Sequence, residues 1–260
     1  MSYQGYKELL VEQQGKLVVV KFNNPRKKNC VNQFGYKEIT RVLTEVNDDE
    51  TVTIVVFTGV GDTFTAGNDL TQSSKSDDIN EFFKQSNANF KKMVLSFVHC
   101  KKIVFALVNG PAIGIGATIV GLCDVAWCSE KAYFSTPFSK LGLVPEGGSS
   151  YMFPYILGRS KASETLLLGE PLTAAEAYQF NFVSRTFKIE ELDSVIWPKL
   201  QKYSELPPNA LTQGKRLIKE GFVDNLLKAN NSECQQLLQS FQHPEFFQAI
   251  MDFAQRKSKL

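Results

Sequence analysis

The sequence predicts an α/β fold with a largely parallel sheet, followed by a helical C-terminal region. Two observations lead to this prediction. Residues 17–128 alternate short apolar runs, rich in β-branched residues, with longer amphipathic stretches, which is typical of strand–helix–strand units. After Glu146 no strand pattern is found, and apolar residues recur at helical spacing as far as residue 255. We therefore divide the chain into an α/β core, residues 1–190, and a helical region, residues 191–260.

The first predicted elements are a strand at 17–22 and the helix that follows it. The strand reads Leu-Val-Val-Val-Lys-Phe and ends in Asn23-Asn24-Pro25, a turn sequence. Asn32 can cap the next helix, in which positions 39, 42, 43 and 46 form an apolar stripe. A continuous apolar run at 52–57 predicts a strand that is buried on both faces of the sheet.

The core continues with two helices and two further strands. The stretch 78–99 predicts a helix with an apolar face formed by Phe90, Met93, Val94 and Phe97. Strands are expected at 103–108 and 125–128, with a short helix at 114–122 between them. The polar residues 71–80 are expected to form a mobile loop.

The C-terminal half is predicted to be helical. Thr173 and Glu176 form a capping box that opens a helix. Pro208 and Pro244 stand where helices can start. Further helices are expected at 190–204, 209–220, 223–240 and 245–255. Their apolar residues should cover the core or meet neighbouring subunits in a closed ring.

Composition gives no reason to expect several classes of function. The chain has 29 Lys and Arg against 27 Asp and Glu, mixed along its length, so a nucleic-acid partner is not expected. The five cysteines show no metal-binding or disulfide spacing, which favours free thiols and no metal site. No apolar run reaches the roughly 20 residues of a membrane span, and no signal peptide is visible. The terminal Ser258-Lys259-Leu260 is a peroxisomal import address, which predicts an import receptor as partner and the peroxisomal matrix as location.

Two glycine-flanked stretches and one glutamate carry the functional information. Residues 64–70 and 108–117 each follow an apolar strand-like run and can present backbone N–H groups to an anionic oxygen. Glu146 is the only acid in a long apolar and glycine-rich segment, and burial there would raise its pKa. Turns and close packing would also explain the glycines, and an exposed loop or helix-terminal acid would explain Glu146. Two donors and one isolated carboxylate suit enolate chemistry.

Other catalytic signatures are missing. Gly114-x-Gly116 is followed by Gly121 and so does not match the dinucleotide fingerprint, and the phosphate loop and the serine nucleophile elbow are absent. The two histidines, His99 and His243, stand at a predicted helix end and a predicted helix start, where structural roles are expected.

The chain resembles the enoyl-CoA hydratase/isomerase (crotonase) superfamily over nearly its whole length. The two glycine-flanked stretches carry the likeness, as Phe64-x-Ala66-Gly67-Asn68-Asp69-Leu70 and Val108-Asn109-Gly110-x-Ala112-x-Gly114-x-Gly116. The likeness continues through Cys123-Asp124, Phe134, Leu141-Gly142-Leu143-x-Pro145 and Thr173-Ala174-x-Glu176-Ala177. The resemblance implies a fold of repeated ββα units with a C-terminal helical trimerisation region, and a homotrimer or dimer of trimers.

The resemblance also implies site residues. An oxyanion hole would be formed by the amides of Ala66 and Ile115, and coenzyme A would be bound by Ala66, Gly67, Asn68, Asp69 and Leu70. The family's hydratases carry two glutamates, but the matching places here hold Thr118 and the stretch 135–138, Ser-Thr-Pro-Phe. Glu146 after Pro145 is instead similar to the single glutamate of the peroxisomal 3-enoyl-CoA isomerases, the type-2 isomerases above all. Their acyl-CoA-binding domain has no counterpart in these 260 residues.

The implied function is an isomerase that converts a 3-enoyl-CoA to the trans-2-enoyl-CoA. Glu146 would move a proton from C2 to C4 while the two amides hold the dienolate oxygen. Coenzyme A would be part of the substrate, without a separate cofactor, and the product would enter β-oxidation of unsaturated fatty acids. A dienoyl-CoA isomerase, a hydratase and a non-catalytic acyl-CoA-binding scaffold are the alternatives.

Overall fold

The computed structural model describes residues 3–69 and 78–257. Its strands, in chain order, are β1 (Leu9–Gln14), β2 (Leu17–Phe22), β3 (Ile54–Gly59), β4 (Ile103–Val108), β5 (Ala112–Ile113), β6 (Val125–Ser129), β7 (Tyr133–Ser135), β8 (Leu172–Thr173) and β9 (Arg185–Phe187). Within these ranges they form a six-stranded sheet, ordered β1-β2-β3-β4-β6-β9, and a three-stranded sheet, ordered β5-β7-β8. In the larger sheet β1 and β2 pair antiparallel, whereas the four remaining pairs are parallel.

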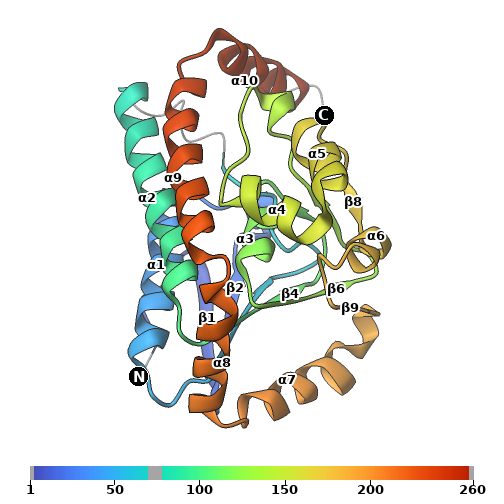
Figure 1. The fold of residues 1–260 in the computed structure, drawn as a ribbon. Helices are drawn as coiled ribbons and strands as arrows, with labels where there is room; N and C mark the ends of the chain where they lie inside the picture. The colour runs from blue at the N-terminus through green and yellow to red at the C-terminus, as the bar shows by residue number, and fades with distance from the viewer. Residues whose placement is uncertain (1–2, 70–77, 258–260) are drawn as a thin grey trace.

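Helices surround the larger sheet and dominate the C-terminal half (Figure 1). The α-helices are α1 (Gln33–Asp48), α2 (Ile79–His99), α3 (Ile115–Leu122), α4 (Ser149–Leu157), α5 (Arg159–Leu167), α6 (Ala174–Gln179), α7 (Trp197–Ser204), α8 (Pro208–Glu220), α9 (Val223–Ser240) and α10 (Pro244–Lys257). Short 3₁₀ turns lie at η1 (Pro25–Lys27), η3 (Ser139–Leu141) and η4 (Ile189–Glu191), and a π-helical turn lies at η5 (Leu192–Ile196).

The central strands are buried on both faces. On β2, Val18 and Val20 point into the main core with α1, α2 and α3, whereas Leu17 and Val19 point into a smaller core closed by α7. The parallel strands β3 and β4 divide their side chains between the two cores in the same way. This explains why the predicted strands read as continuous apolar runs.

Most of the predicted elements are confirmed. The strands at 17–22 and 103–108 have the predicted bounds, and those at 52–57 and 125–128 differ by one or two residues at their ends. Asn32 caps α1 by accepting a hydrogen bond from the amide of Gly35 at 2.9 Å. The capping box at Thr173 and Glu176 is present, and α9 spans the predicted 223–240.

The prediction that no strand follows Glu146 was wrong. β9 pairs in parallel with β6 and completes the larger sheet, and β8 pairs with β7. Strands of two or three residues are too short to show alternation, so their position depends on tertiary pairing. The strand β1 and the helices α4 and α5 were also not predicted. The helix expected at 190–204 is irregular before α7, since Pro198 lacks the amide that a regular helix needs.

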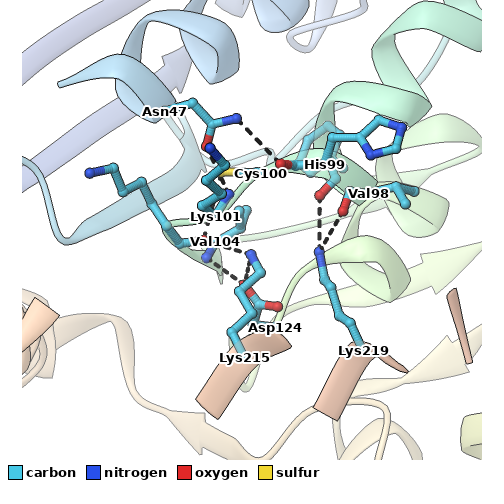
Figure 2. A network of polar contacts seen from close by, with 11 residues as sticks. Asn47, Val98, His99, Cys100, Lys101, Val104, Asp124, Lys215 and Lys219 are labelled. Atoms are coloured by element: carbon cyan, nitrogen blue, oxygen red, sulfur yellow. Dashed lines mark hydrogen bonds and ion pairs between the residues drawn. The ribbon is translucent and has the colours of Figure 1, made fainter. Parts of the chain in front are cut away.

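The helical C-terminal region is joined to the core by partly buried polar contacts. Figure 2 shows Lys215 of α8 reaching Asp124, and Lys219 reaching the end of α2. The ammonium group of Lys215 forms an ion pair with Asp124 and donates to the carbonyl of Lys102 at 2.6 Å. Lys219 donates to the carbonyls of Phe97 and Val98, at 3.2 and 3.1 Å, in the last turn of α2. Burial, with the nearby charge of Lys215, lowers the pKa of Lys219 to about 8.

Two further findings concern the whole described chain. No helix in the described ranges is long and apolar enough to cross a membrane. The five cysteines are free thiols. The predicted loop at 71–80 falls largely on residues 70–77, which lie outside the described residues.

Candidate active site

The fold brings the two glycine-flanked stretches together. Thr65 pairs with Ala112 in a parallel bridge, and the amide of Ile113 donates to the carbonyl of Thr65 at 2.9 Å. Gly67 has a φ of +83°, and a β-carbon there would lie 2.6 Å from the carbonyl oxygen of Ile113. The backbones therefore approach closely enough that only glycine fits at residue 67.

The amides of the first stretch are not equally available. The amide of Ala66 donates to the carbonyl of Lys28 at 2.8 Å, and that of Asp69 donates to the carbonyl of Val31 at 2.9 Å. The amide of Gly67 donates to the hydroxyl of Thr65 at 3.1 Å. Between them, the amide of Asn68 has no acceptor among the described residues. The predicted donor Ala66 is therefore already engaged within the fold, and Asn68 is the amide left open.

The second stretch ends in a helix start. Ile115 is the first residue of α3, and within the described chain its amide has no acceptor, as is usual for the first turn of a helix. Gly114 precedes it as the helix cap with a φ of +55°. Ala66, Asn68 and Ile115 line the same cavity, so the structure brings the two predicted amide segments to one place.

Glu146 lies on the turn that leads into α4 and faces this cavity. Two glycines with left-handed backbone, Gly147 and Gly148, follow it, with φ values of +71° and +76°. The carbonyl of Glu146 accepts a hydrogen bond from the amide of Ser149 at 3.2 Å, which closes the turn. A carboxylate from another helix, Glu233 of α9, accepts hydrogen bonds from the amides of Gly148 at 2.6 Å and Ser150 at 2.8 Å.

The environment of Glu146 favours the protonated carboxyl. Burial is the largest cause, and the negative charge of Glu233 is the second, and together they raise the pKa of Glu146 to about 8. Glu146 keeps some exposure because it opens onto the cavity. A carboxylate with a pKa near neutrality can both accept and return a proton, which matches what the sequence predicted for this residue.

The cavity measures about 830 Å³ and combines an apolar interior with basic residues. Aromatic side chains from α2 and from the corner between α9 and α10 form one wall: the rings of Phe83 and Phe241 stack at 4.5 Å, and Phe246 meets Phe83 edge-on at 5.4 Å. The basic residues that line the cavity are Arg26, Lys27, Lys28 and Lys140.

The basic residues differ in how far they are engaged. Lys27 is paired with Asp69 at 2.9 Å, and Lys140 donates to the carbonyl of Gly169 at 3.1 Å. Arg26 is exposed and makes no hydrogen bond or ion pair with the described part of the chain. An anionic group could therefore reach the guanidinium of Arg26 without displacing another contact.

The remaining predicted site residues have different outcomes. Gly67, Asn68 and Asp69 line the cavity, whereas Leu70 and the targeting residues Ser258, Lys259 and Leu260 lie outside the described residues. Neither histidine is among the residues that line the cavity. Within the described ranges no group of three or more His, Cys, Asp or Glu side chains could hold a metal ion.

Sequence reasoning missed Glu233. The signal was present, because Glu233 stands on the buried face of α9 with Leu226, Cys234 and Leu237. A charged residue on the apolar stripe of an amphipathic helix is unusual and indicates a specific partner.

Comparison with known proteins shows the family to which this chain is similar. Residues 12–259 match the family described as enoyl-CoA hydratase/isomerase. The chain is 39% identical over 258 residues to "Enoyl-CoA delta isomerase 2" of Rattus norvegicus, which covers 99% of this chain and 66% of that protein. It is 37% identical over 254 residues to "Enoyl-CoA delta isomerase 3, peroxisomal" of Mus musculus, covering 97% of this chain and 80% of that protein. The chain thus spans just under two thirds of the length of the rat relative.

Solved structures show the same fold. An enoyl-CoA hydratase/isomerase from Pseudoalteromonas atlantica T6c superposes with a TM-score of 0.87 at 30% identity, covering 96% of this chain and 98% of that one. The predicted fold, an α/β core of the crotonase type with a helical C-terminal region, is therefore confirmed.

Proposed function

This chain belongs to the enoyl-CoA hydratase/isomerase family, and we propose that it is a Δ3-Δ2-enoyl-CoA isomerase. It would convert a 3-enoyl-CoA to the trans-2-enoyl-CoA. The observation that carries the proposal is the carboxylate of Glu146, with a pKa raised to about 8, in a cavity that it shares with two open backbone amides.

The carboxylate of Glu146 acts first as a base. It removes a proton from C2 of the substrate, and the electrons move into the thioester to give a dienolate. The same carboxyl then donates the proton to C4, and the double bond is left between C2 and C3. One group can serve both steps because a carboxyl whose pKa is raised to about 8 can accept a proton and return it.

The dienolate oxygen needs donors placed before the reaction begins. We assign this role to the amides of Asn68 and Ile115, in place of the predicted pair Ala66 and Ile115. The reason is that the amide of Ala66 already donates to Lys28, whereas those of Asn68 and Ile115 have no acceptor within the described residues. In a complex with an acyl-CoA, both nitrogens should lie about 2.7–3.1 Å from the thioester oxygen.

The cavity suits the rest of an acyl-CoA. Coenzyme A carries phosphate groups, for which Arg26 offers an unengaged guanidinium at the cavity. The acyl chain is apolar, and the wall around Phe83, Phe241 and Phe246 offers an apolar surface. The reaction as written calls for neither a metal nor a redox cofactor, and coenzyme A enters as part of the substrate.

The isomerase is favoured over a hydratase because acids are missing where the hydratases of the family have them. The residue at the first place, Thr118, is 1% exposed, and its hydroxyl donates to the carbonyl of Ile115 at 3.2 Å. At the second place, Phe138 lines the cavity with an apolar ring. Adding water would need a second carboxyl to position it, and neither place supplies one.

Location and assembly are part of the same proposal. The terminal Ser258-Lys259-Leu260 and the relative named peroxisomal support a peroxisomal matrix enzyme in β-oxidation of unsaturated fatty acids. A homotrimer or dimer of trimers would cover apolar side chains that the single chain leaves exposed, such as Leu217 and Ile218 on α8, which are 61% and 72% exposed.

A spectrophotometric assay tests the proposed activity. Purified protein should convert 3-hexenoyl-CoA to 2-hexenoyl-CoA, with little hydration of 2-hexenoyl-CoA supplied separately. Binding of 3-hexenoyl-CoA without turnover would favour the non-catalytic scaffold, and faster hydration than isomerisation would favour a hydratase.

A further inference from the structure

Glu233 is a buried carboxylate that takes no part in the proton transfer described above. It lies on α9 and is 5% exposed. One of its oxygens, Oε2, accepts a hydrogen bond from the amide of Gly148 at 2.6 Å, and the other, Oε1, accepts one from the amide of Ser150 at 2.8 Å. Because both oxygens accept from N–H groups, these contacts are suited to the ionised carboxylate.

We propose that Glu233 is the positioning residue for Glu146: from α9 it holds the turn that carries the base and keeps a negative charge beside it. This inference rests on the proposed function of Glu146. It assigns to the helical C-terminal region a direct part in setting the geometry of the active site.

The turn after Glu146 needs contacts from neighbouring helices to fix its backbone. Glu146 is followed by two glycines, a sequence with wide backbone freedom in the absence of outside contacts. A β-carbon at Gly147 would lie 2.5 Å from the hydroxyl oxygen of Thr118 on α3, and one at Gly148 would collide with Leu226 on α9. The turn is therefore held between α3 and α9, and the two hydrogen bonds to Glu233 are its polar link to α9.

Among the groups around Glu146, Glu233 is the carboxyl. Burial raises its pKa, whereas the hydrogen bonds from the amides of Ser150 and Gly148 lower the pKa and so favour the ionised form. On α1, burial raises the pKa of Tyr36 well above its ordinary value, so Tyr36 is neutral. On α9, burial raises the pKa of Cys234 to about 12, so this thiol is neutral too. Two other titratable groups are Lys91 and Cys30. The ammonium group of Lys91 on α2 donates to the side chain of Asn231 at 2.5 Å, and Cys30 lines the cavity that Glu146 faces. Removing the charge of Glu233 should therefore make Glu146 ionise more easily.

A purely structural role for Glu233 would give a different result. As a cap on the first turn of α4, it would contribute to stability alone, and its loss would lower the melting temperature without changing the chemistry. A positioning residue also affects kcat, since small displacements of a catalytic group are costly, and it changes the pH at which the base ionises.

Two substitutions separate the effect of the charge of Glu233 from the effect of its side-chain length. Glu233→Gln keeps the length of the side chain and removes its charge, whereas Glu233→Asp keeps the charge and shortens the reach to the two amides. The matched control is Glu220→Gln, which makes the same chemical change on the surface of α8, where Glu220 pairs with Arg216. All variants are compared with the parent in the intact chain, with 3-hexenoyl-CoA as substrate.

For Glu233→Gln we expect kcat to fall roughly 10- to 100-fold with KM within about threefold of the parent. The acid limb of kcat/KM should move to lower pH. Glu233→Asp should lower kcat while the acid limb stays in place, and it decides the question if the Gln variant does not fold. The proposal would be overturned if the folded variants had the same kcat as the control Glu220→Gln and the acid limb of their kcat/KM pH profile did not move.

A titration that does not depend on turnover keeps this result separate from the proposed function. The side-chain carboxyl carbon of Glu146 is followed by NMR in protein labelled with ¹³C-glutamate, and its signal is identified by its absence in Glu146→Gln. A lower titration midpoint in Glu233→Gln supports the proposal even if the parent protein proves not to be an isomerase. An unchanged midpoint together with an unchanged kcat contradicts it.

Discussion

Replacing Glu146 by glutamine should make the protein more stable at high pH. In the folded chain the pKa of Glu146 is raised from the ordinary value of 4.5 to about 8, chiefly by burial. Ionising this carboxyl therefore costs more in the folded state than in the unfolded chain. The cost is absent below pH 4.5, grows as the pH rises from 4.5 to 8, and is constant above that range. Glutamine cannot ionise, so the variant avoids it.

The size of the effect follows from the two pKa values. At about 1.36 kcal/mol per pKa unit, the difference corresponds to an upper limit of about 5 kcal/mol. Because Glu146 opens onto a cavity that water can enter, we expect roughly 2–3 kcal/mol in practice. The variant's advantage in the free energy of unfolding should therefore increase by that amount between pH 4.5 and pH 9.

Urea denaturation at several pH values, at one protein concentration, measures the effect. The parent, Glu146→Gln and the surface control Glu220→Gln are unfolded in parallel, so that changes in the charge of the whole protein cancel. If the difference between parent and Glu146→Gln is the same at pH 5 and pH 9, Glu146 ionises as an ordinary carboxyl. The argument from burial would then be refuted.

Three further predictions concern the turn after Glu146, the contact of α8 with the core, and the C-terminal tripeptide. Gly148→Ala should cost roughly 1–3 kcal/mol in stability and lower the activity, because Gly148 has a left-handed backbone and packs against α9. The control is Gly214→Ala on α8, where a β-carbon would meet open space, and this change should not destabilise the protein. Lys215→Met should destabilise by roughly 1–3 kcal/mol, seen as a lower urea midpoint, because Asp124 loses its ion-pair partner and keeps only the hydrogen bond from the amide of Val104, while kcat of the folded protein stays near that of the parent. Deleting residues 258–260 should leave activity and oligomer size unchanged but prevent import into peroxisomes; import of the truncated protein expressed alone would contradict the targeting prediction.

The sequence was sufficient for elements whose own pattern determines their structure. The strand at 17–22 alternates between two cores, and α1 has both an apolar stripe and the cap Asn32. The short strand β9 could not be found in this way, because its three residues join the sheet only through their pairing with β6. Local pattern carries no information about such a partner.

The same distinction applies to the site. Glu146 stood out as a lone acid in an apolar, glycine-rich segment, and the two glycine-flanked stretches indicated amide donors. Which of these amides is free to bind a ligand depends on the hydrogen bonds that the fold makes. The amide of Ala66 donates to the carbonyl of Lys28, which is far away in the sequence, whereas the amide of Asn68 has no acceptor among the described residues. Glu233 lies on another helix, so its contact with the turn after Glu146 could be seen only in the folded structure.

The most direct test of the account is the isomerisation rate of Glu146→Gln with 3-hexenoyl-CoA. The variant should fold and bind acyl-CoA nearly as the parent does, and its kcat should fall by about 10²–10⁴-fold or more, because the group that moves the proton from C2 to C4 is gone. A kcat within a few-fold of the parent, in a variant shown to be folded, would contradict the central claim and remove Glu146 from the mechanism.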